Sequence, residues 1–288
     1  MKSGANNIRI ALAIILLTQY SYAQKGARMP RKVKVEGGIF FGASNYAGTL
    51  EEKIINYNYT LPGYGAMIRY NFTNKFSLRF GLDYGTIEDA DSAASSIARN
   101  IRNLSFKTSI FDGYLAGEYY FATWSDRYKK FSQLYILGGI GSFHFNPQAL
   151  YNGKWYNLQP LGTEGQGTQE YPNRVPYSLD QIYFPIGLGA RFTLSSSWFL
   201  NFEFRANKTL TDYLDDVSLT YASPDVLLAQ GGPISVALAN RTGEKFPNDV
   251  RDVTGGSRGG TKVSTDWFYF TGFTLSHTFK PKRHCYSF

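Results

Sequence analysis

The chain of 288 residues carries 30 basic and 22 acidic residues, a formal net charge of +8, and is 17% aromatic but only 18% charged. Its single cysteine, Cys285, excludes an internal disulfide, so this is not a small secreted scaffold held together by disulfides. The positive charge suits nucleic acid, an anionic lipid surface or an acidic protein, and we set nucleic acid aside because the N-terminus is typical of an exported chain.

The first expected element is a signal peptide over residues 1–23. Lys2 and Arg9 flank a short apolar run at 10–17, and the small Ala23 precedes the expected cleavage point. The run is shorter than the roughly 20 apolar residues that a membrane-spanning helix needs. We therefore expect an exported chain without a helical anchor, beginning with a periplasmic N-terminal segment at 24–32.

Strands are predicted wherever apolar and polar side chains alternate with a period of two. The clearest case is 76–87, where Phe76, Leu78, Phe80 and Leu82 alternate with small or charged residues. Strand 132–145 alternates less cleanly, and its faces stay unassigned. The eight predicted strands cover 33–44, 62–73, 76–87, 104–121, 132–145, 181–194, 198–209 and 266–279.

The connections between these strands alternate in length. Short ones lie at 73–75, 122–130 and 195–197, whereas the long ones cover 45–61, 88–103, 146–180 and 210–265. Short turns at one rim and long loops at the other are typical of an outer-membrane barrel. A soluble β-sandwich shows the same alternation along its strands, but its turns are short at both ends.

The sequence therefore predicts an all-β fold, an eight-stranded antiparallel transmembrane β-barrel over 33–280 in the bacterial outer membrane. Its short turns are expected in the periplasm, its long loops outside the cell, and a periplasmic tail at 281–288. A further hairpin formed by 217–222 and 234–239 would raise the count to ten strands, and this alternative stays open.

The two faces of the predicted strands differ in character. One face is apolar, as in Ile39, Phe41 and Ile68, and is expected to contact outer-membrane lipid. The other face carries charges, and a basic group facing lipid at mid-membrane costs about 2 to 4 kcal/mol. We therefore expect nine charged residues to point inward: Glu36, Arg69, Arg79, Asp83, Asp112, Glu118, Arg191, Glu203 and Arg205. Five acids and four bases in so narrow a barrel should pair and fill it, which argues against an open diffusion pore.

Signals for catalysis and metal binding are weak. His144 shares a strand face with Ser142, and outer-membrane enzymes that remodel lipid A often use a histidine with a serine and an acid, but no motif marks a nucleophile. The acidic runs 88–91 and 211–218 lack the glycine-pivoted ligand pattern of a calcium loop and suit loop solvation or strand-end capping better. We expect no enzyme, no catalytic residue, no cofactor and no metal.

Basic residues gather at the rim expected to face the periplasm. They form a candidate docking surface for an acidic partner, with plain solvation and lipid headgroup contact as alternatives. Cys285 belongs to the same rim, where a crosslink to a partner and a free thiol both stay open. The rim residues are Arg31, Lys32, Arg127, Lys129, Lys130, Lys280, Lys282 and Arg283.

Seven segments, in order and spacing, carry a family resemblance. They are "FFGASNYAGTL" (40–50), "SLRFGLDYGTIEDADS" (77–92), "RNLSFKTSIFDGYLAGEYYF" (102–121), "YILGGIGSFHFNPQALYNGKWYNLQPLGTEGQG" (135–167), "YFPIGLGARFTLS" (183–195), "TDYLDDVS" (211–218) and "DWFYFTGFTLSHTF" (266–279). With these segments the chain resembles the PorG-like outer-membrane barrel family of the type IX secretion system, the export machinery associated with gliding bacteria. Thr49 stands where an Asp is expected, and Gly260 where an Asn is usual.

The resemblance implies an eight-stranded barrel without known catalysis, associated with the periplasmic ring of the secretion machinery. We therefore favour a structural component that anchors a periplasmic assembly through its basic rim. The alternative is a surface receptor or adhesin, or a lipid A modifying enzyme, that acts through the long loops. The aromatic segment 150–160 is the part of those loops best suited to bind sugar or protein.

Overall fold

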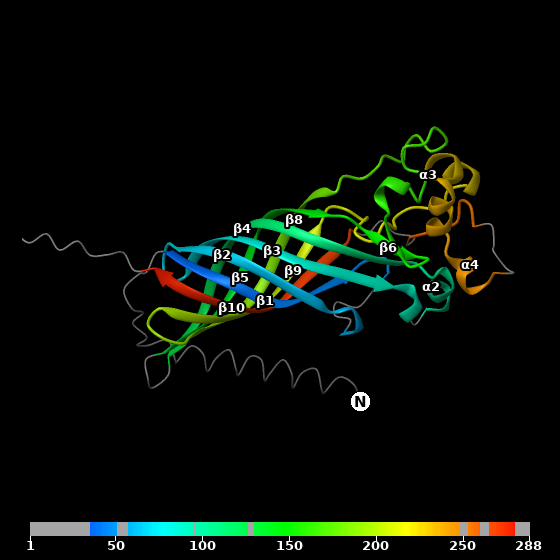
Figure 1. Ribbon diagram of the computed structural model, residues 1–288. Helices are drawn as coiled ribbons and strands as arrows, with labels where there is room; N and C mark the ends of the chain where they lie inside the picture. The colour runs from blue at the N-terminus through cyan, green and yellow to red at the C-terminus, as the bar shows by residue number, and fades with distance from the viewer. Residues whose placement is uncertain are drawn as a thin grey trace, which may run out of the picture.

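The computed structural model describes residues 35–50, 57–94, 96–125, 130–247, 253–259 and 265–279. The predicted signal peptide, the segment 24–32 and the tail 281–288 lie outside these ranges. Within them, most of the chain forms one long barrel with a cap of loops and short helices at one end (Figure 1).

Eight strands close the barrel, which confirms the predicted fold class. Each strand pairs antiparallel with its neighbour, β3 pairs with β4, and β10 returns to β1 with Val35 opposite Phe279. The barrel strands are β1 (Val35–Ala47), β2 (Leu61–Asn71), β3 (Phe76–Ala90), β4 (Ser105–Ser125), β5 (Phe131–Phe145), β8 (Asp180–Thr193), β9 (Trp198–Thr209) and β10 (Trp267–Phe279).

The extra hairpin exists, but not where the sequence suggested it. Strands β6 (Gln148–Tyr151) and β7 (Lys154–Asn157) form a hairpin that joins the barrel only where Gln148 pairs with Lys107 of β4. Its turn is Asn152–Gly153, both with positive φ, as a two-residue type I′ turn requires. The hairpin extends the wall beyond the barrel and does not widen it.

The ten-strand alternative is therefore wrong. Its second strand, 234–239, lies in helix α3 (Pro224–Ala239), where Pro233 follows a break at Gly232 and restarts the helix. Within 234–239 the buried residues are Ser235, Leu238 and Ala239, at the spacing of one helical face. The apolar run reads as a strand by composition, but its burial follows a helical period.

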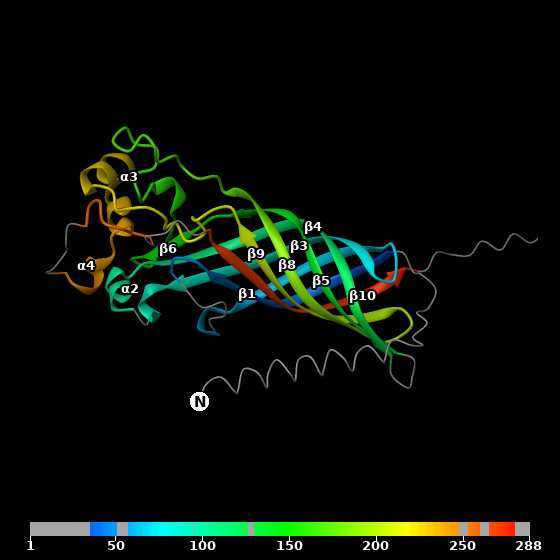
Figure 2. The same cartoon turned by 180° about the vertical axis from the view of Figure 1, so that it is seen from behind.

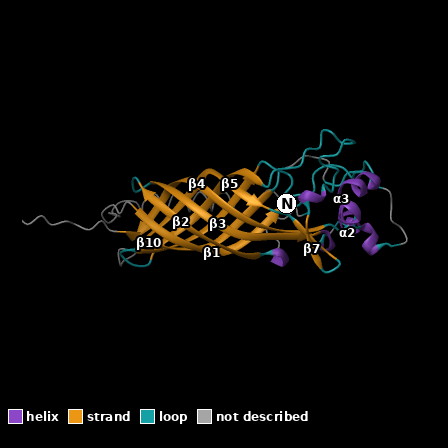
Figure 3. Ribbon diagram, turned by 45° about the horizontal axis from the view of Figure 1, so that its top comes forward, coloured by secondary structure: helices purple, strands orange, loops and turns teal. Residues whose placement is uncertain are grey.

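The cap covers the long-loop end (Figures 2 and 3). Besides α3 and the β6–β7 hairpin it contains α2 (Ile97–Arg102), α4 (Thr242–Lys245) and the 3-10 turns η1 (Tyr57–Tyr59), η2 (Asp91–Ala93) and η3 (Gln159–Leu161). Within the described ranges no helix has the length and apolar character needed to cross a membrane.

The barrel wall places apolar side chains outside and charged ones inside, the reverse of a soluble protein. Its outer face is apolar, with Ile39, Phe41 and Ile68 each more than half exposed, and its inner face carries the buried charges. Strand β5, whose faces the sequence left open, turns Tyr135, Leu137 and the phenylalanines at 143 and 145 inward and leaves Ile136, Ile140 and His144 outside.

Candidate functional site

The barrel interior is stacked in three layers between the short turns and the cap. A layer of ion pairs comes first, an aromatic layer follows, and an acid-rich layer lies under the cap. All nine charged residues predicted for the interior are buried in the first layer. The inward period of each strand places them there, because side chains two residues apart share a face.

Eight of the nine charges form one continuous chain of ion pairs. Arg69 Nη1 lies 2.5 Å from Glu36 Oε1, and Arg69 Nε lies 2.7 Å from Glu118 Oε2. Arg79 joins Glu118 to Glu203, with its Nη1 2.8 Å from Glu203 Oε2. The full order is Arg191, Glu36, Arg69, Glu118, Arg79, Glu203, Arg205 and Asp83.

The ninth charge, Asp112, stands beside the end of this chain. It is paired in register with Asp83 on the neighbouring strand and accepts a 2.6 Å hydrogen bond from the Tyr183 hydroxyl. Asp83 instead binds Arg205, whose Nη1 donates to the Tyr114 hydroxyl at 2.5 Å. Arginine's fixed fork of donors lets each guanidinium serve two partners, which a lysine would do less well.

Tyrosines complete the ionic layer, and the sequence reasoning missed them. Tyr120 and Tyr135 each donate a 2.7 Å hydrogen bond, to Glu118 and Glu203 respectively. The Tyr135 ring lies over Gly189, its register partner, where a Cβ would stand 2.2 Å from the ring. A tyrosine directly opposite a glycine recurs at Tyr114 and Gly81. A tyrosine opposite a glycine could have identified the inward tyrosines from the sequence, but only once the strand register is known.

An aromatic layer lies above the ion pairs. Phe143 packs against Phe145, Tyr183 and Phe268 with ring centroids 5.3 to 5.8 Å apart, and Phe270 meets Phe268 edge to face. These rings are almost fully buried. The layer separates the ion pairs from the cap and fills the remaining cross-section with apolar surface.

The acid-rich layer connects the cap to the barrel. The Tyr46 hydroxyl at the end of β1 lies 2.7 Å from Asp215 Oδ2 and 3.2 Å from Asp266 Oδ1. Burial raises the pKa of Asp215 to about 8 and, together with the charge of Asp215, raises the pKa of Asp266 well above its usual range. Both carboxyls also accept backbone N–H groups, from Val217 and Leu214.

A second cluster holds the long loops to one another. Glu164 accepts hydrogen bonds from the N–H groups of Ser218 and Leu219 and lies 3.3 Å from Arg258 Nη1. Arg258 also donates to the carbonyl oxygens of Ala239 and Asp216. Burial raises the pKa of Asp216 to about 6 against the opposing charge of Arg258. These groups connect three distant stretches of the cap.

The predicted acidic runs lie in this network. Asp91, from 88–91, forms a two-pronged contact with Arg102 at 2.6 and 2.7 Å and accepts the N–H of Leu104 at 3.0 Å. Asp212, Asp215 and Asp216 come from 211–218. Among the described residues no group of three histidine, cysteine or acidic side chains is arranged to hold a metal ion.

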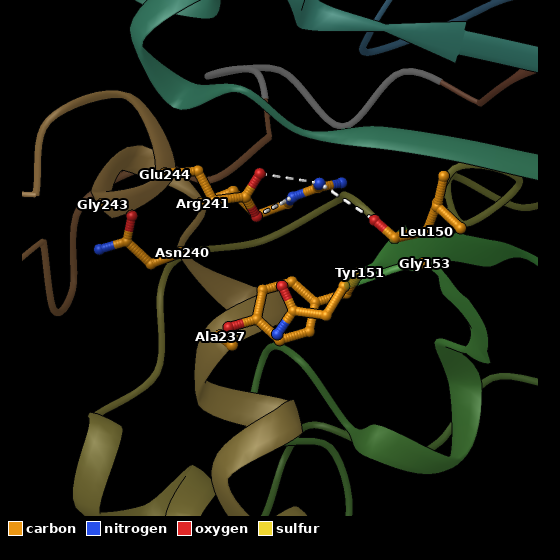
Figure 4. A pocket seen from close by; sticks show the side chains of 9 residues that line it. Leu150, Tyr151, Gly153, Ala237, Asn240, Arg241, Gly243 and Glu244 are labelled. Atoms are coloured by element: carbon orange, nitrogen blue, oxygen red, sulfur yellow. Dashed lines mark hydrogen bonds and ion pairs between the residues drawn. The ribbon is translucent and has the colours of Figure 1, made fainter.

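An open pocket of about 500 Å³ lies between the β6–β7 hairpin and the helices (Figure 4). Arg241 crosses it and is fully engaged, with Glu244 Oε1 at 2.7 Å, Ser105 Oγ at 2.7 Å and the Leu150 carbonyl at 3.1 Å. The guanidinium therefore fastens the hairpin to the helices and is not directed at a ligand.

Outside the barrel wall, His144 and Asp180 form an exposed pair. Their register positions on β5 and β8 are opposite, and His144 Nδ1 lies 2.9 Å from Asp180 Oδ1. Ser142 is exposed on the same face of β5. Of the predicted rim residues only Lys130 is described, and it is exposed at the short-turn end. The others, Arg31, Lys32, Arg127, Lys129, Lys280, Lys282 and Arg283, lie outside the described residues.

Comparison with solved structures finds several small barrels. The chain is similar to Neisserial surface protein A, at 9% identity and a TM-score of 0.41, over 85% of this chain and 97% of that one. It is similar to Ail, the attachment invasion locus protein of Yersinia pestis, at 9% identity and a TM-score of 0.35, over 84% and 99%. It is also similar to the outer membrane protein OprG of Pseudomonas aeruginosa, at 11% identity and a TM-score of 0.34, over 84% of this chain and 93% of that one.

No curated protein sequence matches the chain. A family model described as a domain of unknown function, DUF6089, matches residues 10–222. This match covers most of the chain, so the protein belongs to the DUF6089 family.

Proposed function

We propose that this protein is a closed outer-membrane barrel that anchors a periplasmic assembly of the type IX secretion machinery. The observation that carries the proposal is the continuous ion-pair chain from Arg191 to Asp83, together with the aromatic layer above it. A lumen filled in this way leaves the surfaces of the barrel, and not its interior, to perform the function.

The outer wall supports a place in the membrane. Apolar side chains ring the barrel at alternate positions, and Ile68 at 59% exposed is typical of them. A continuous apolar belt of this kind is unfavourable in water but suits the acyl chains of a bilayer. Export by the predicted signal peptide then leads to the outer membrane.

The resemblance of seven ordered segments to the PorG-like family supports the secretion role. The basic rim adds a physical reason, since a cluster of cations beside the membrane attracts an acidic partner and steers its approach. Lys130 is the exposed member of that rim within the described residues.

Co-purification tests the proposal. The tagged barrel is expressed in its native bacterium, crosslinked, solubilised in mild detergent and isolated, and the bound proteins are identified by mass spectrometry. We expect periplasmic ring proteins with the wild type and at least a tenfold lower yield from R127E/K129E/K130E. The matched control, K154E/K208E/K245E, reverses three charges at the opposite end and should keep the partners. Recovery of the barrel alone from wild-type cells would contradict the proposal.

A second candidate role, as a surface receptor or adhesin, rests on the β6–β7 hairpin. Trp155, 47% exposed, and Leu150 project from this hairpin beyond the barrel. Exposed aromatic rings are suited to stacking on sugars or on protein surfaces. A glycan array would test the sugar-binding form of this role: binding that W155A abolishes favours it, and an array without signal removes it.

A further inference from the structure

The exposed pair of His144 and Asp180 has the geometry of a general base with its orienting acid. Asp180 Oδ1 lies 2.9 Å from Nδ1 of the imidazole. A carboxylate at that distance favours the tautomer with the proton on Nδ1, which leaves the lone pair of Nε2 free to accept a proton. His144 is 54% exposed and Asp180 81% exposed, so a reactant can reach the imidazole.

A serine stands within reach of this base. Ser142 precedes His144 by two residues on β5, and both side chains face outward. Residues at this spacing in a strand share a face about 6.6 Å apart. The proposed reaction requires the Ser142 side chain to turn its Oγ toward Nε2 while Asp180 holds the imidazole through Nδ1. Such contacts commonly tighten only when substrate binds.

The surroundings identify the substrate class. Phe111, the register partner of His144, is more than half exposed, and the outward Ile140 and Ile182 flank Ser142. These three side chains belong to the apolar belt, whereas Asp180 begins β8 at the long-loop end. The serine and histidine therefore lie where acyl chains meet headgroups, which is the depth of a lipid ester bond.

We propose that Ser142, His144 and Asp180 form a serine esterase site that hydrolyses acyl esters of outer-leaflet lipid. This activity goes beyond the anchoring role, and it occupies the opposite end of the barrel from the basic rim. The three roles are nucleophile for Ser142, general base and acid for His144, and orientation of the imidazole for Asp180.

The steps balance without any added reagent except water. His144 Nε2 takes the hydroxyl proton while Ser142 Oγ bonds to the ester carbonyl carbon, and the C–O bond to the alcohol breaks as Nε2 returns the proton to that alcohol. Water then attacks the acyl-serine, again losing a proton to Nε2, and the fatty acid leaves as Ser142 regains its hydrogen.

A fluorophosphonate reagent, which phosphonylates only activated serines, tests the site without knowledge of the lipid. The purified full-length protein in detergent is treated and its peptides are analysed by mass spectrometry. We expect an adduct on Ser142, and a labelling rate at least about 100-fold lower in H144A, because a general base contributes about that much or more. The control S109A removes another outward serine and should label normally. Labelling of Ser142 that H144A does not change would overturn the proposal.

A second measurement identifies the lipid. Wild-type protein and S142A, H144A and D180N are reconstituted in vesicles of phosphatidylethanolamine or of lipopolysaccharide, and released fatty acid is quantified. Release by the wild type from either lipid, lost in S142A and H144A, supports the site and names its substrate. If the wild type releases fatty acid no faster than S142A does with both lipids, the proposal is overturned. Barrel folding is checked by heat-modifiable gel migration, and co-purification of periplasmic partners tests the anchoring role separately.

Discussion

Asp83 and Asp112 face one another across β3 and β4 inside the barrel, yet they are bound by different partners. Asp83 is paired with the Arg205 guanidinium, and Asp112 accepts the Tyr183 hydroxyl at 2.6 Å. Two carboxylates at facing register positions repel one another, and the interior carries five acids against four arginines. The two aspartates should therefore differ in what they contribute to stability.

Substitution of each aspartate by asparagine tests this difference. D112N keeps an oxygen acceptor for Tyr183 and removes a like charge, so we expect its free energy of unfolding to stay within about 1 kcal/mol of the wild type. D83N leaves Arg205 without its closest counter-charge and should cost about 3 to 5 kcal/mol. Urea unfolding in detergent micelles, followed by tryptophan fluorescence, measures both. Equal losses would contradict the assignment of partners.

Removal of Arg79 should break the ion-pair chain at its middle. R79A leaves the buried carboxylates of Glu118 and Glu203 facing one another without a shared cation, and we expect a loss of about 3 to 5 kcal/mol in the same assay. The control K107A removes a half-exposed pair with Glu88 and should cost about 1 kcal/mol or less. Similar losses in the two variants would show that the buried chain does not stabilise the barrel.

The cap should loosen as the pH rises. Carboxyls of an unfolded chain titrate near pH 4, whereas burial raises the pKa of Asp212 and Asp216 to about 6 and that of Asp215 to about 8. The folded cap therefore holds protons that the unfolded cap has lost. This stabilisation is complete below about pH 4 and is lost progressively as the pH rises through 6 and then 8.

Hydrogen exchange of residues 210–219, corrected for the intrinsic rate, measures this loss between pH 5 and pH 9. We expect protection to fall over that range in the wild type. In D215N the fall between pH 7 and pH 9 should be smaller, because the amide cannot ionise. D225N, on the exposed first turn of α3, should behave like the wild type. Protection that rises with pH would contradict the prediction.

If the apolar belt contacts lipid, an added arginine should destabilise the protein more on the belt than in the cap. I68R places a cation on the outward face of β2, and we expect it to destabilise the barrel in phospholipid vesicles by about 2 to 4 kcal/mol. V175R adds the same charge to the cap, where Val175 is already exposed, and should stay within about 0.5 kcal/mol. A neutral result for I68R would mean that this wall does not contact lipid.

Arg258 should stabilise the cap but not the barrel. Its guanidinium is buried and joins Glu164, the Ala239 carbonyl and the Asp216 carbonyl. We expect R258A to raise hydrogen exchange and protease cleavage in 210–247 while the folded barrel keeps its gel migration. D225N, on the exposed first turn of α3, is the control. Loss of the folded barrel band in R258A would show that cap and barrel fold as one unit.

One wrong prediction and one missed signal mark the limits of local pattern. The apolar residues of 234–239 look like a strand until Pro233 and the burial of Leu238 and Ala239 are seen, because a short apolar run suits either element. The Asn–Gly pair at 152–153 is a hairpin signal that the sequence reasoning missed, and the position of that hairpin outside the barrel depends on where β4 ends.

The sequence by itself determined the strands, the two faces of the wall and the identity of the inward charges, since all follow from a period of two and from the cost of a charge in lipid. Only the tertiary structure decided which charges meet, that tyrosines and phenylalanines fill the space between them, and that Asp180 reaches His144. Those contacts join residues up to 240 positions apart, such as Ser276 and Glu36. They depend on the register in which the barrel closes, which no single strand contains.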